Sequence, residues 1–291
     1  MVKDNYDLCD INDLKALLEG NGFRFSKALG QNFLVDRTVP ERIAEASLAD
    51  KYSFVLEIGP GVGCLTRELS DLSGRVAAVE IDKRLPDILA ITLKDRDNVE
   101  IIAGDVLKMD VPALVREKSG GLTPRVCANL PYNITSPAIT ELLRPRLFET
   151  VTVMIQKEAA ERLCAEPGTA DYGAFTVFAN WYSVPEILFD VPNTCFMPRP
   201  QVASAVVRMR KREAPPVSVK NEELFFKIVR ASFAQRRKTL LNGLASAFGD
   251  RLSKAEIQNA MEACGITAGA RGETLGIEEF ARLSDHLSDV I

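Results

Sequence analysis

The chain has 291 residues, 46% of them hydrophobic, and its 36 basic and 40 acidic side chains give a net charge of -4. A chain of this size can bury one large core beside a small second domain, and its acidity argues against a protein that is basic throughout. The N-terminus lacks the basic-then-apolar order of a secretory signal, and no 18 apolar residues run together. We therefore expect a cytoplasmic protein.

The predicted elements begin with a short helix between Asp10, as its N-cap, and Gly20. Five short apolar or β-branched runs follow, separated by helix-length segments. They cover residues 53–59, 75–82, 99–105, 125–131 and 151–156. This alternation predicts an α/β fold with a parallel sheet and helices on both of its faces.

The first predicted strand runs into a glycine-rich turn that contains Gly59, Gly61 and Gly63. Such a turn lets the backbone lie against a ligand without an intervening Cβ. For a dinucleotide site, the pattern G-x-G-x-x-G counted from Gly59 would need a glycine or alanine where Cys64 stands. A dinucleotide site is therefore disfavoured, although a nicotinamide-dependent dehydrogenase remains an alternative.

The next two predicted strands end in carboxylates, Glu80 and Asp105. Glu80 could accept hydrogen bonds from ribose hydroxyls, and Asp105 could accept one from an adenine amino group. Either residue alone is equally well explained as an ordinary strand-end cap. A glycine turn followed by two carboxylates at successive strand ends predicts a nucleoside pocket.

The fourth predicted strand ends in the tetrapeptide Asn129-Leu130-Pro131-Tyr132. An asparagine oxygen and a neighbouring backbone carbonyl could each accept one N–H of an adenine amine, which would direct its lone pair at a methyl donor. The proline would make the turn rigid, and the tyrosine ring could stack on the base. Taken alone, the four residues would be an ordinary strand-ending turn.

The six cysteines are widely separated, contain no C-x-x-C pair and are accompanied by one histidine, His286. This pattern predicts reduced thiols and no metal site.

A last strand is predicted at residues 203–209, and Ala214-Pro215-Pro216 then interrupts the chain. Apolar residues recur at helical spacing over 224–233, 240–248 and 280–287, and Ser253 to Glu256 forms a capping box. We therefore predict two domains, residues 1–210 with the sheet and residues 211–291 as a small helical domain.

Basic residues are concentrated near this boundary. Residues 196–240 contain eleven basic side chains against three acidic ones. On charge alone a solvated helix face explains this excess, and a polyanion-binding face is the alternative.

Taken together, these motifs resemble the KsgA/RsmA family of 16S rRNA adenine N6,N6-dimethyltransferases, which is related to the Erm resistance methylases. Further matches are Gly30-Gln31-Asn32-Phe33-Leu34, Gln156-Lys157-Glu158, Pro167-Gly168, Tyr172-Gly173, the pattern F-x-P-x-P-x-V-x-S from Phe196 to Ser204, Ser232-Phe233 and Arg236 to Leu240. The resemblance covers most of the chain and implies a Rossmann-like class I methyltransferase sheet with a small C-terminal helical domain.

The resemblance also implies site residues and partners. The cofactor would be S-adenosyl-L-methionine, bound by Asn32, Leu34, Gly59, Gly61, Glu80, Asp105 and Asn129. The methyl-acceptor site would comprise Asn129, Leu130, Pro131, Tyr132 and Phe196, with Tyr132 and Phe196 on either side of the target base. The substrate would be two adjacent adenosines in the 3'-terminal hairpin of 16S rRNA within the small ribosomal subunit, and the enzyme would act as a monomer. An Erm-type 23S rRNA methylase and a non-catalytic ribosome-assembly factor remain alternatives.

With this resemblance, the basic segment becomes a candidate RNA face. We expect a long helix from Phe233 to Leu244 whose residues Arg236, Arg237 and Lys238 contact phosphates, while the shape of the hairpin gives selectivity.

Overall fold

The computed structural model describes residues 6–26, 29–235 and 237–290. They form two compact units. The first unit is the described part of Met1–Ala160 with Val184–Lys211, and the second is Glu161–Ser183 with the described part of Arg212–Ile291. The predicted boundary after residue 210 falls one residue before the last of the three points at which the chain passes between the units. Residues 161–183, which the prediction assigned to the first domain, pack with the C-terminal helices.

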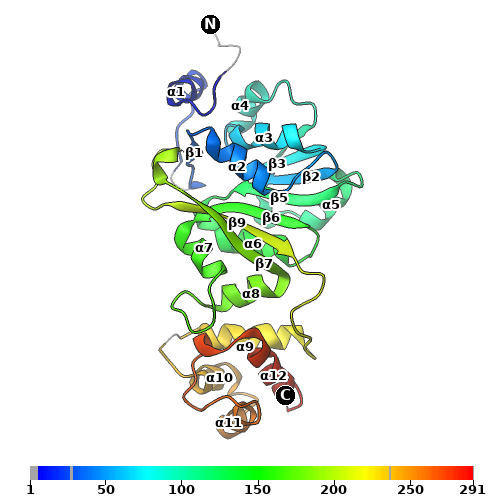
Figure 1. The fold of residues 1–291 in the computed structure, drawn as a ribbon, viewed down its shortest axis with the longest axis vertical. Coiled ribbons are helices and arrows are strands. Elements are labelled where there is room, and N and C mark those ends of the chain that lie inside the picture. The colour runs from blue at the N-terminus through cyan, green and yellow to red at the C-terminus, as the bar shows by residue number, and fades with distance from the viewer. Residues whose placement is uncertain (1–5, 27–28, 236, 291) are drawn as a thin grey trace. The chain divides into compact units, whose positions relative to one another are not determined.

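The first unit is built on a seven-stranded sheet with the order β4-β3-β2-β5-β6-β9-β7 (Figure 1). The strands are β2 (Ser53–Ile58), β3 (Arg75–Glu80), β4 (Val99–Ala103), β5 (Thr123–Asn129), β6 (Thr150–Gln156), β7 (Ser183–Val191) and β9 (Ser204–Lys211). β2 to β6 are parallel, and β9 is antiparallel to β6. This confirms the predicted α/β class and the five parallel strands.

Two features of the sheet were not predicted. β9 was expected as a strand, but its antiparallel direction was not, and β7 was missed altogether. β7 contains Pro185 and two acidic residues and alternates only weakly between buried and exposed positions. Its sequence therefore lacks the period-two pattern by which strands are recognised.

Helices cover both faces of the sheet (Figure 1). They are α2 (Thr38–Ala46), α3 (Cys64–Leu72), α4 (Leu85–Thr92), α5 (Val111–Lys118), α6 (Thr135–Leu143) and α7 (Lys157–Leu163), which crosses into the second unit. α2 and α3 share a core with alternate side chains of the central strands. Ile43, Val55, Leu69, Cys127 and Met154 are fully buried in it. This packing fixes the strand ends that carry the site.

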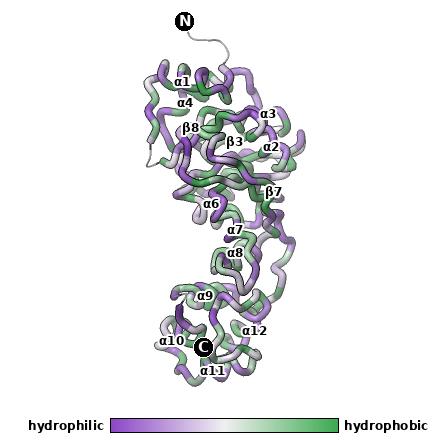
Figure 2. The backbone as a smooth tube through the Cα atoms, turned by 60° about the vertical axis from the view of Figure 1, so that its left-hand side comes forward, coloured by the Kyte–Doolittle hydropathy of each residue, from purple (hydrophilic) through white to green (hydrophobic). Residues whose placement is uncertain are grey.

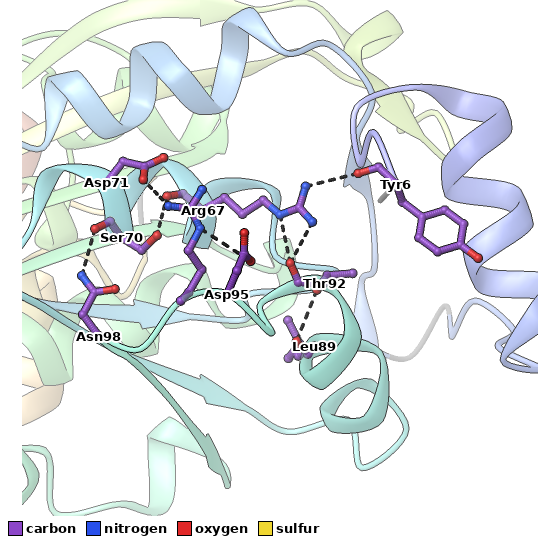
Figure 3. Close-up of polar contacts among 9 residues, drawn as sticks. Tyr6, Arg67, Ser70, Asp71, Leu89, Thr92, Asp95 and Asn98 are labelled. Atoms are coloured by element: carbon purple, nitrogen blue, oxygen red, sulfur yellow. Dashed lines mark hydrogen bonds and ion pairs between the residues drawn. The ribbon is translucent and has the colours of Figure 1, made fainter. Parts of the chain in front are cut away.

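The N-terminal helix α1 (Ile11–Gly20) docks on this unit through one apolar face. Asp10 is its N-cap, as the sequence predicted, and the Asp10 side chain accepts hydrogen bonds from the backbone N–H groups of Asn12 and Asp13. Apolar and polar residues alternate along α1 (Figure 2), and its buried leucines pack on residues of α4 and on Phe33. Arg67 of α3 also connects the N-terminal segment to α4. It donates to the backbone oxygen of Thr92, at the end of α4, and to that of Tyr6, which precedes α1 (Figure 3).

A short two-stranded sheet holds the segment between α1 and α2. β1 (Phe33–Leu34) pairs antiparallel with β8 (Phe196–Met197), so that Leu34 lies opposite Phe196. The N–H of Val35 extends the pairing by donating to the carbonyl of Cys195 at 2.8 Å. Two motifs that are far apart in the sequence are thereby joined.

The second unit is helical, as predicted for its C-terminal part. Its helices are α8 (Ala174–Tyr182), α9 (Glu222–Phe233), α10 (Leu240–Phe248), α11 (Lys254–Ala263) and α12 (Ile277–Ser288). Trp181 stacks on Phe225 with ring centroids 4.4 Å apart, and Tyr182 donates to Glu222 at 2.6 Å. These contacts join α8 to α9. No helix in the described ranges is both long enough and apolar enough to cross a membrane.

The predicted long helix from Phe233 to Leu244 is wrong. α9 ends at Phe233 and α10 begins at Leu240, and the described residues between them are not helical. Thr239 is the N-cap of α10, because its side chain accepts a hydrogen bond from the backbone N–H of Asn242 at 3.4 Å. The two apolar series therefore belong to separate helices.

Candidate active site

A cavity lies at the carboxyl ends of the parallel strands and brings most of the predicted site together. It encloses about 1170 Å³ including its mouth, which opens to solvent. Its lining includes ten of the predicted residues: Asn32, Leu34, Gly59, Gly61, Glu80, Asp105, Asn129, Leu130, Pro131 and Tyr132. All of these except Asn32 and Leu34 converge because the carboxyl ends of neighbouring parallel strands meet at one edge of a sheet.

The glycine turn after β2 is closely packed. Gly59 and Gly61 have φ angles of +70° and +61°, a region that other residues rarely adopt. A Cβ on Gly61 would lie 3.0 Å from the Phe33 ring, which is tighter than nine in ten real Cβ contacts, so the ring or the turn would have to shift. Phe33 itself lines the cavity. The turn therefore has no room for a side chain on its Phe33 side.

Glu80 ends β3 beside this turn and is only 5% exposed. Its Oε1 accepts the backbone N–H of Asp82 at 2.8 Å, and Gly61 also donates a backbone hydrogen bond to it. Burial raises the pKa of Glu80, and these hydrogen bonds act against that rise. A buried carboxylate held in this way is a fixed acceptor for ligand hydroxyls.

Asp105 follows β4 and is partly exposed in the cavity wall. Its carboxylate accepts the backbone N–H of Leu107 at 3.1 Å and lies 3.5 Å from the ammonium group of Lys108. Asp105 therefore caps the following turn, as expected of a strand-end cap, and it also lines the cavity, as expected of a residue in a nucleoside pocket.

The segment Gly30 to Leu34 is hydrogen-bonded to residues at the ends of two strands, β3 and β5. The Gln31 amide donates to Asp82 at 2.7 Å, which ties the segment to the residues after β3. The pKa of Asp82 is lowered to about 2, chiefly by its hydrogen bond with Arg84. The Asn129 amide donates to the backbone oxygen of Asn32 at 3.3 Å, which ties the same segment to the end of β5.

The tetrapeptide after β5 is held by hydrogen bonds of its own. The N–H of Leu130 donates to Met154 of β6 at 3.1 Å, and the oxygen of Pro131 accepts the N–H of Ile134. The Tyr132 hydroxyl is 2.8 Å from Ser204 Oγ, and burial raises the pKa of this tyrosine. Both backbone and ring at the tip of β5 are thus fixed in place.

Phe196 lies outside this cavity lining. It is 4% exposed and belongs to the core under α2 and α3, with its backbone paired to Leu34. Tyr132 lines the cavity, whereas Phe196 is paired with a lining residue, Leu34. Stacking of a base between these two rings therefore stays a prediction.

Glu57 is a lining residue that the sequence analysis did not select. It is 1% exposed, and its Oε2 has no hydrogen-bond partner among the described residues. Burial raises its pKa to about 8. The sequence feature that could have pointed to Glu57 is its position in Glu-Ile-Gly-Pro-Gly, on the strand that leads into the glycine turn.

The lining fits S-adenosyl-L-methionine, a nucleoside with a cationic amino-acid tail. The backbone of the turn lines the cavity at Gly59 and Gly61 with no Cβ at either position, which suits close approach of a ligand to that backbone. The fixed carboxylate of Glu80 suits a ribose. Glu80, Asp105, Asn32 and the glycine turn are the residues that would hold the cofactor.

The predicted RNA-binding residues belong to the second unit. Arg237 and Lys238 are exposed in the turn before α10, and Arg236 lies outside the described residues. Other basic residues of the 196–240 segment have structural partners. Four such ion pairs are Arg208 and Arg210 with Glu186, Lys211 with Glu149, and Lys220 with Asp289. The local charge excess is therefore not one continuous free surface.

Comparison with known proteins identifies the family. The model of the family "Ribosomal RNA adenine dimethylase" matches residues 22–289. "Ribosomal RNA small subunit methyltransferase A" of Geobacillus thermodenitrificans is 48% identical over 284 residues, which cover 97% of each chain. A dimethyladenosine transferase from Plasmodium falciparum is 26% identical with a TM-score of 0.71, covering 86% of this chain and 95% of that one. The 23S rRNA methyltransferase ErmE is 30% identical with a TM-score of 0.66, covering 88% and 99%. The chain belongs to the ribosomal RNA adenine dimethylase family of S-adenosyl-L-methionine-dependent methyltransferases.

Proposed function

We propose that this enzyme transfers methyl groups to N6 of two adjacent adenosines in the 3'-terminal hairpin of 16S rRNA, forming N6,N6-dimethyladenosine. The observation that carries the proposal is the position of Asn129, held at the cavity edge by its hydrogen bond to Asn32. The small-subunit substrate is supported by the name of the relative that is 48% identical over nearly the full chain.

The chemistry needs an acceptor for each amine hydrogen. The lone pair of an adenine amine is delocalised into the ring, so the nitrogen becomes a better nucleophile when its geometry shifts towards tetrahedral. Since the Asn129 amide nitrogen is bound to Asn32, its oxygen is the atom that accepts one N–H. The Leu130 carbonyl accepts the other. Together they would orient the lone pair before reaction.

S-adenosyl-L-methionine supplies an electrophilic methyl group on a sulfonium whose leaving group is a neutral thioether. The protein's contribution is then positioning. Glu80 and Asp105 hold the nucleoside, and Asn129 and Leu130 orient the amine. Tyr132 supplies a ring for the extruded base, and its hydrogen bond to Ser204 fixes the direction of that ring.

Recognition of the RNA is assigned to the helical part of the chain. We place phosphate contacts at Arg236, Arg237 and Lys238, and we assign RNA binding to a small domain of residues 211–291 and methyl transfer to a domain of residues 1–210. Exposure of Arg237 and Lys238 next to the start of α10 supports this assignment, since helix N-termini also attract phosphate. The enzyme would work as a monomer in the cytoplasm, during biogenesis of the small subunit.

The decisive experiment supplies the enzyme and methyl-labelled cofactor with small subunits isolated from cells that lack this modification. Digestion of the RNA is expected to yield N6,N6-dimethyladenosine from two adjacent positions near the 3' end of 16S rRNA. A parallel reaction contains unmodified 23S rRNA, because ErmE is 30% identical to this chain. Label confined to 23S rRNA would favour an Erm-type activity, and tight subunit binding without label would favour an assembly factor.

A further inference from the structure

Two cysteine side chains meet behind the glycine turn. Cys9 lies just before α1, and Cys64 is the first residue of α3. Cys9 packs against the buried cluster that contains Cys64, although the two residues are distant in the sequence. The interaction between their thiols lowers the pKa of Cys9 and raises that of Cys64. Cys64 Sγ also lies 3.4 Å from the backbone oxygen of Leu8, so the N-terminal segment passes directly over this thiol.

This approach is fixed by contacts on the N-terminal side of Cys9. Arg67 donates to the oxygen of Tyr6 at 3.2 Å (Figure 3), and Asp7 forms an ion pair with Arg37 at 2.8 Å. The N–H of Cys9 donates to the Asp7 carboxylate at 3.1 Å. The segment is therefore held against α3 on more than one side, and the meeting of the thiols is part of the packed fold.

The two thiols differ in ways that suit sequential oxidation. Cys9 is partly exposed, and the interaction with the Cys64 thiol lowers its pKa, which favours the reactive thiolate. Cys64 is buried, and the same interaction together with burial raises its pKa. An accessible thiolate beside a protected thiol is the arrangement of an attacking and a resolving cysteine.

We propose that Cys9 and Cys64 are a redox pair that peroxide converts to a disulfide, joining the N-terminal segment to the first turn of α3. The Cys9 thiolate attacks one peroxide oxygen, the O–O bond breaks, and Cys9 becomes a sulfenic acid as hydroxide leaves and takes a proton. The Cys64 thiol then attacks the sulfenic sulfur, the S–S bond forms, and a second water leaves. The two thiols lose two electrons, and the peroxide is reduced to two waters.

The disulfide would act on the cofactor site through Cys64. Cys64 follows Gly63 directly and lines the cavity, and it shares a buried cluster with Phe33 and Val62. Bond formation draws the two sulfurs closer than any non-bonded contact. Because Phe33 already limits the space around Gly61, a shift of Cys64 towards Cys9 moves the turn away from its ligand-binding position. Oxidation therefore weakens cofactor binding.

The test uses the full chain, first reduced and then treated with hydrogen peroxide at about one equivalent. Peptide mapping without reductant is expected to find the segments of Cys9 and Cys64 linked. Calorimetric titration with S-adenosyl-L-methionine is expected to show an affinity loss of about fivefold or more, which dithiothreitol reverses. The readout contains no RNA, so it is independent of the proposed rRNA substrate.

Two variants serve as controls. Cys9→Ser should keep its cofactor affinity after peroxide, whereas Cys264→Ser, which alters a half-buried cysteine of the second unit, should respond as the unaltered protein does. Absence of the linked peptide would overturn the redox pair. A linked protein with unchanged affinity, or an equal loss in Cys9→Ser, would overturn its coupling to the cofactor site.

Discussion

The side-chain amide of Asn129 donates a hydrogen bond to the backbone oxygen of Asn32, 97 residues earlier in the chain, at 3.3 Å. This bond joins the end of β5 to the segment Gly30 to Leu34, which lines the cavity. It also fixes which end of the carboxamide is available to a substrate. The proposed cofactor pocket and the proposed acceptor site are therefore connected through one side chain.

Replacing Asn129 with alanine removes the acceptor for one amine hydrogen. We expect the turnover number to fall by about 100-fold or more, the usual effect of losing one such transition-state contact. Cofactor affinity should change by less than about tenfold, because Glu80 and the glycine turn are retained. Single-turnover transfer and calorimetry measure the two quantities, with exposed Asn242→Ala as control. Transfer at the normal rate in Asn129→Ala contradicts the proposed role.

Gly61→Ala tests the close packing of the cofactor turn. The added Cβ would lie 3.0 Å from the Phe33 ring, at a residue with φ of +61°. Cofactor affinity is expected to fall by about tenfold or more, since either the turn or the ring must move. Gly120→Ala is the matched control, because Gly120 has a φ of +58° but open space around it. If both variants bind the cofactor equally well, contact with Phe33 does not shape the site.

The sequence predicted which side chains gather around the cavity, because these side chains follow parallel strands. Once β2 to β5 were recognised, Glu80, Asp105 and Asn129 had to meet at one edge of the sheet. Contacts that depend on tertiary pairing were not predictable in the same way. The β1–β8 pairing buries Phe196, and the meeting of Cys9 with Cys64 depends on how α1 docks.

Local signals also failed where two patterns ran together. The apolar series of α9 and α10 share the helical spacing, and the basic stretch between them is compatible with one long helix, but the cap at Thr239 starts a new helix. Glu57 was overlooked because a carboxylate inside a strand has no distinctive spacing. Its importance follows from complete burial, which single-sequence reasoning cannot assign to an acidic residue.

Glu57 should make stability depend on pH. Burial raises its pKa from 4.5 to about 8, so the folded state binds the proton more tightly than the unfolded state. The stabilisation that comes from this tighter proton binding is complete below about pH 4.5 and is lost as the pH rises towards about 8. Glu57→Gln should remove it, so the variant gains on the order of a few kcal/mol relative to the parent across this interval.

Denaturant unfolding at pH values from about 5 to 9 measures this difference. Glu117→Gln, which alters a side chain that is 70% exposed, is the control and should follow the parent curve. A constant difference between Glu57→Gln and the parent at every pH would show that Glu57 does not titrate in this range.

The last prediction concerns the turn before α10. Arg237 and Lys238 are exposed there, and each phosphate contact releases counterions on RNA binding. The double variant Arg237→Ala, Lys238→Ala should bind subunit RNA more weakly, and the slope of log affinity against log salt should fall by about 1 to 2. Arg251→Ala removes another exposed charge from the same unit and should leave that slope unchanged. Filter binding at several salt concentrations gives both slopes. Equal slopes for all three proteins would place the RNA contacts elsewhere, because a phosphate contact cannot be lost without a change in counterion release.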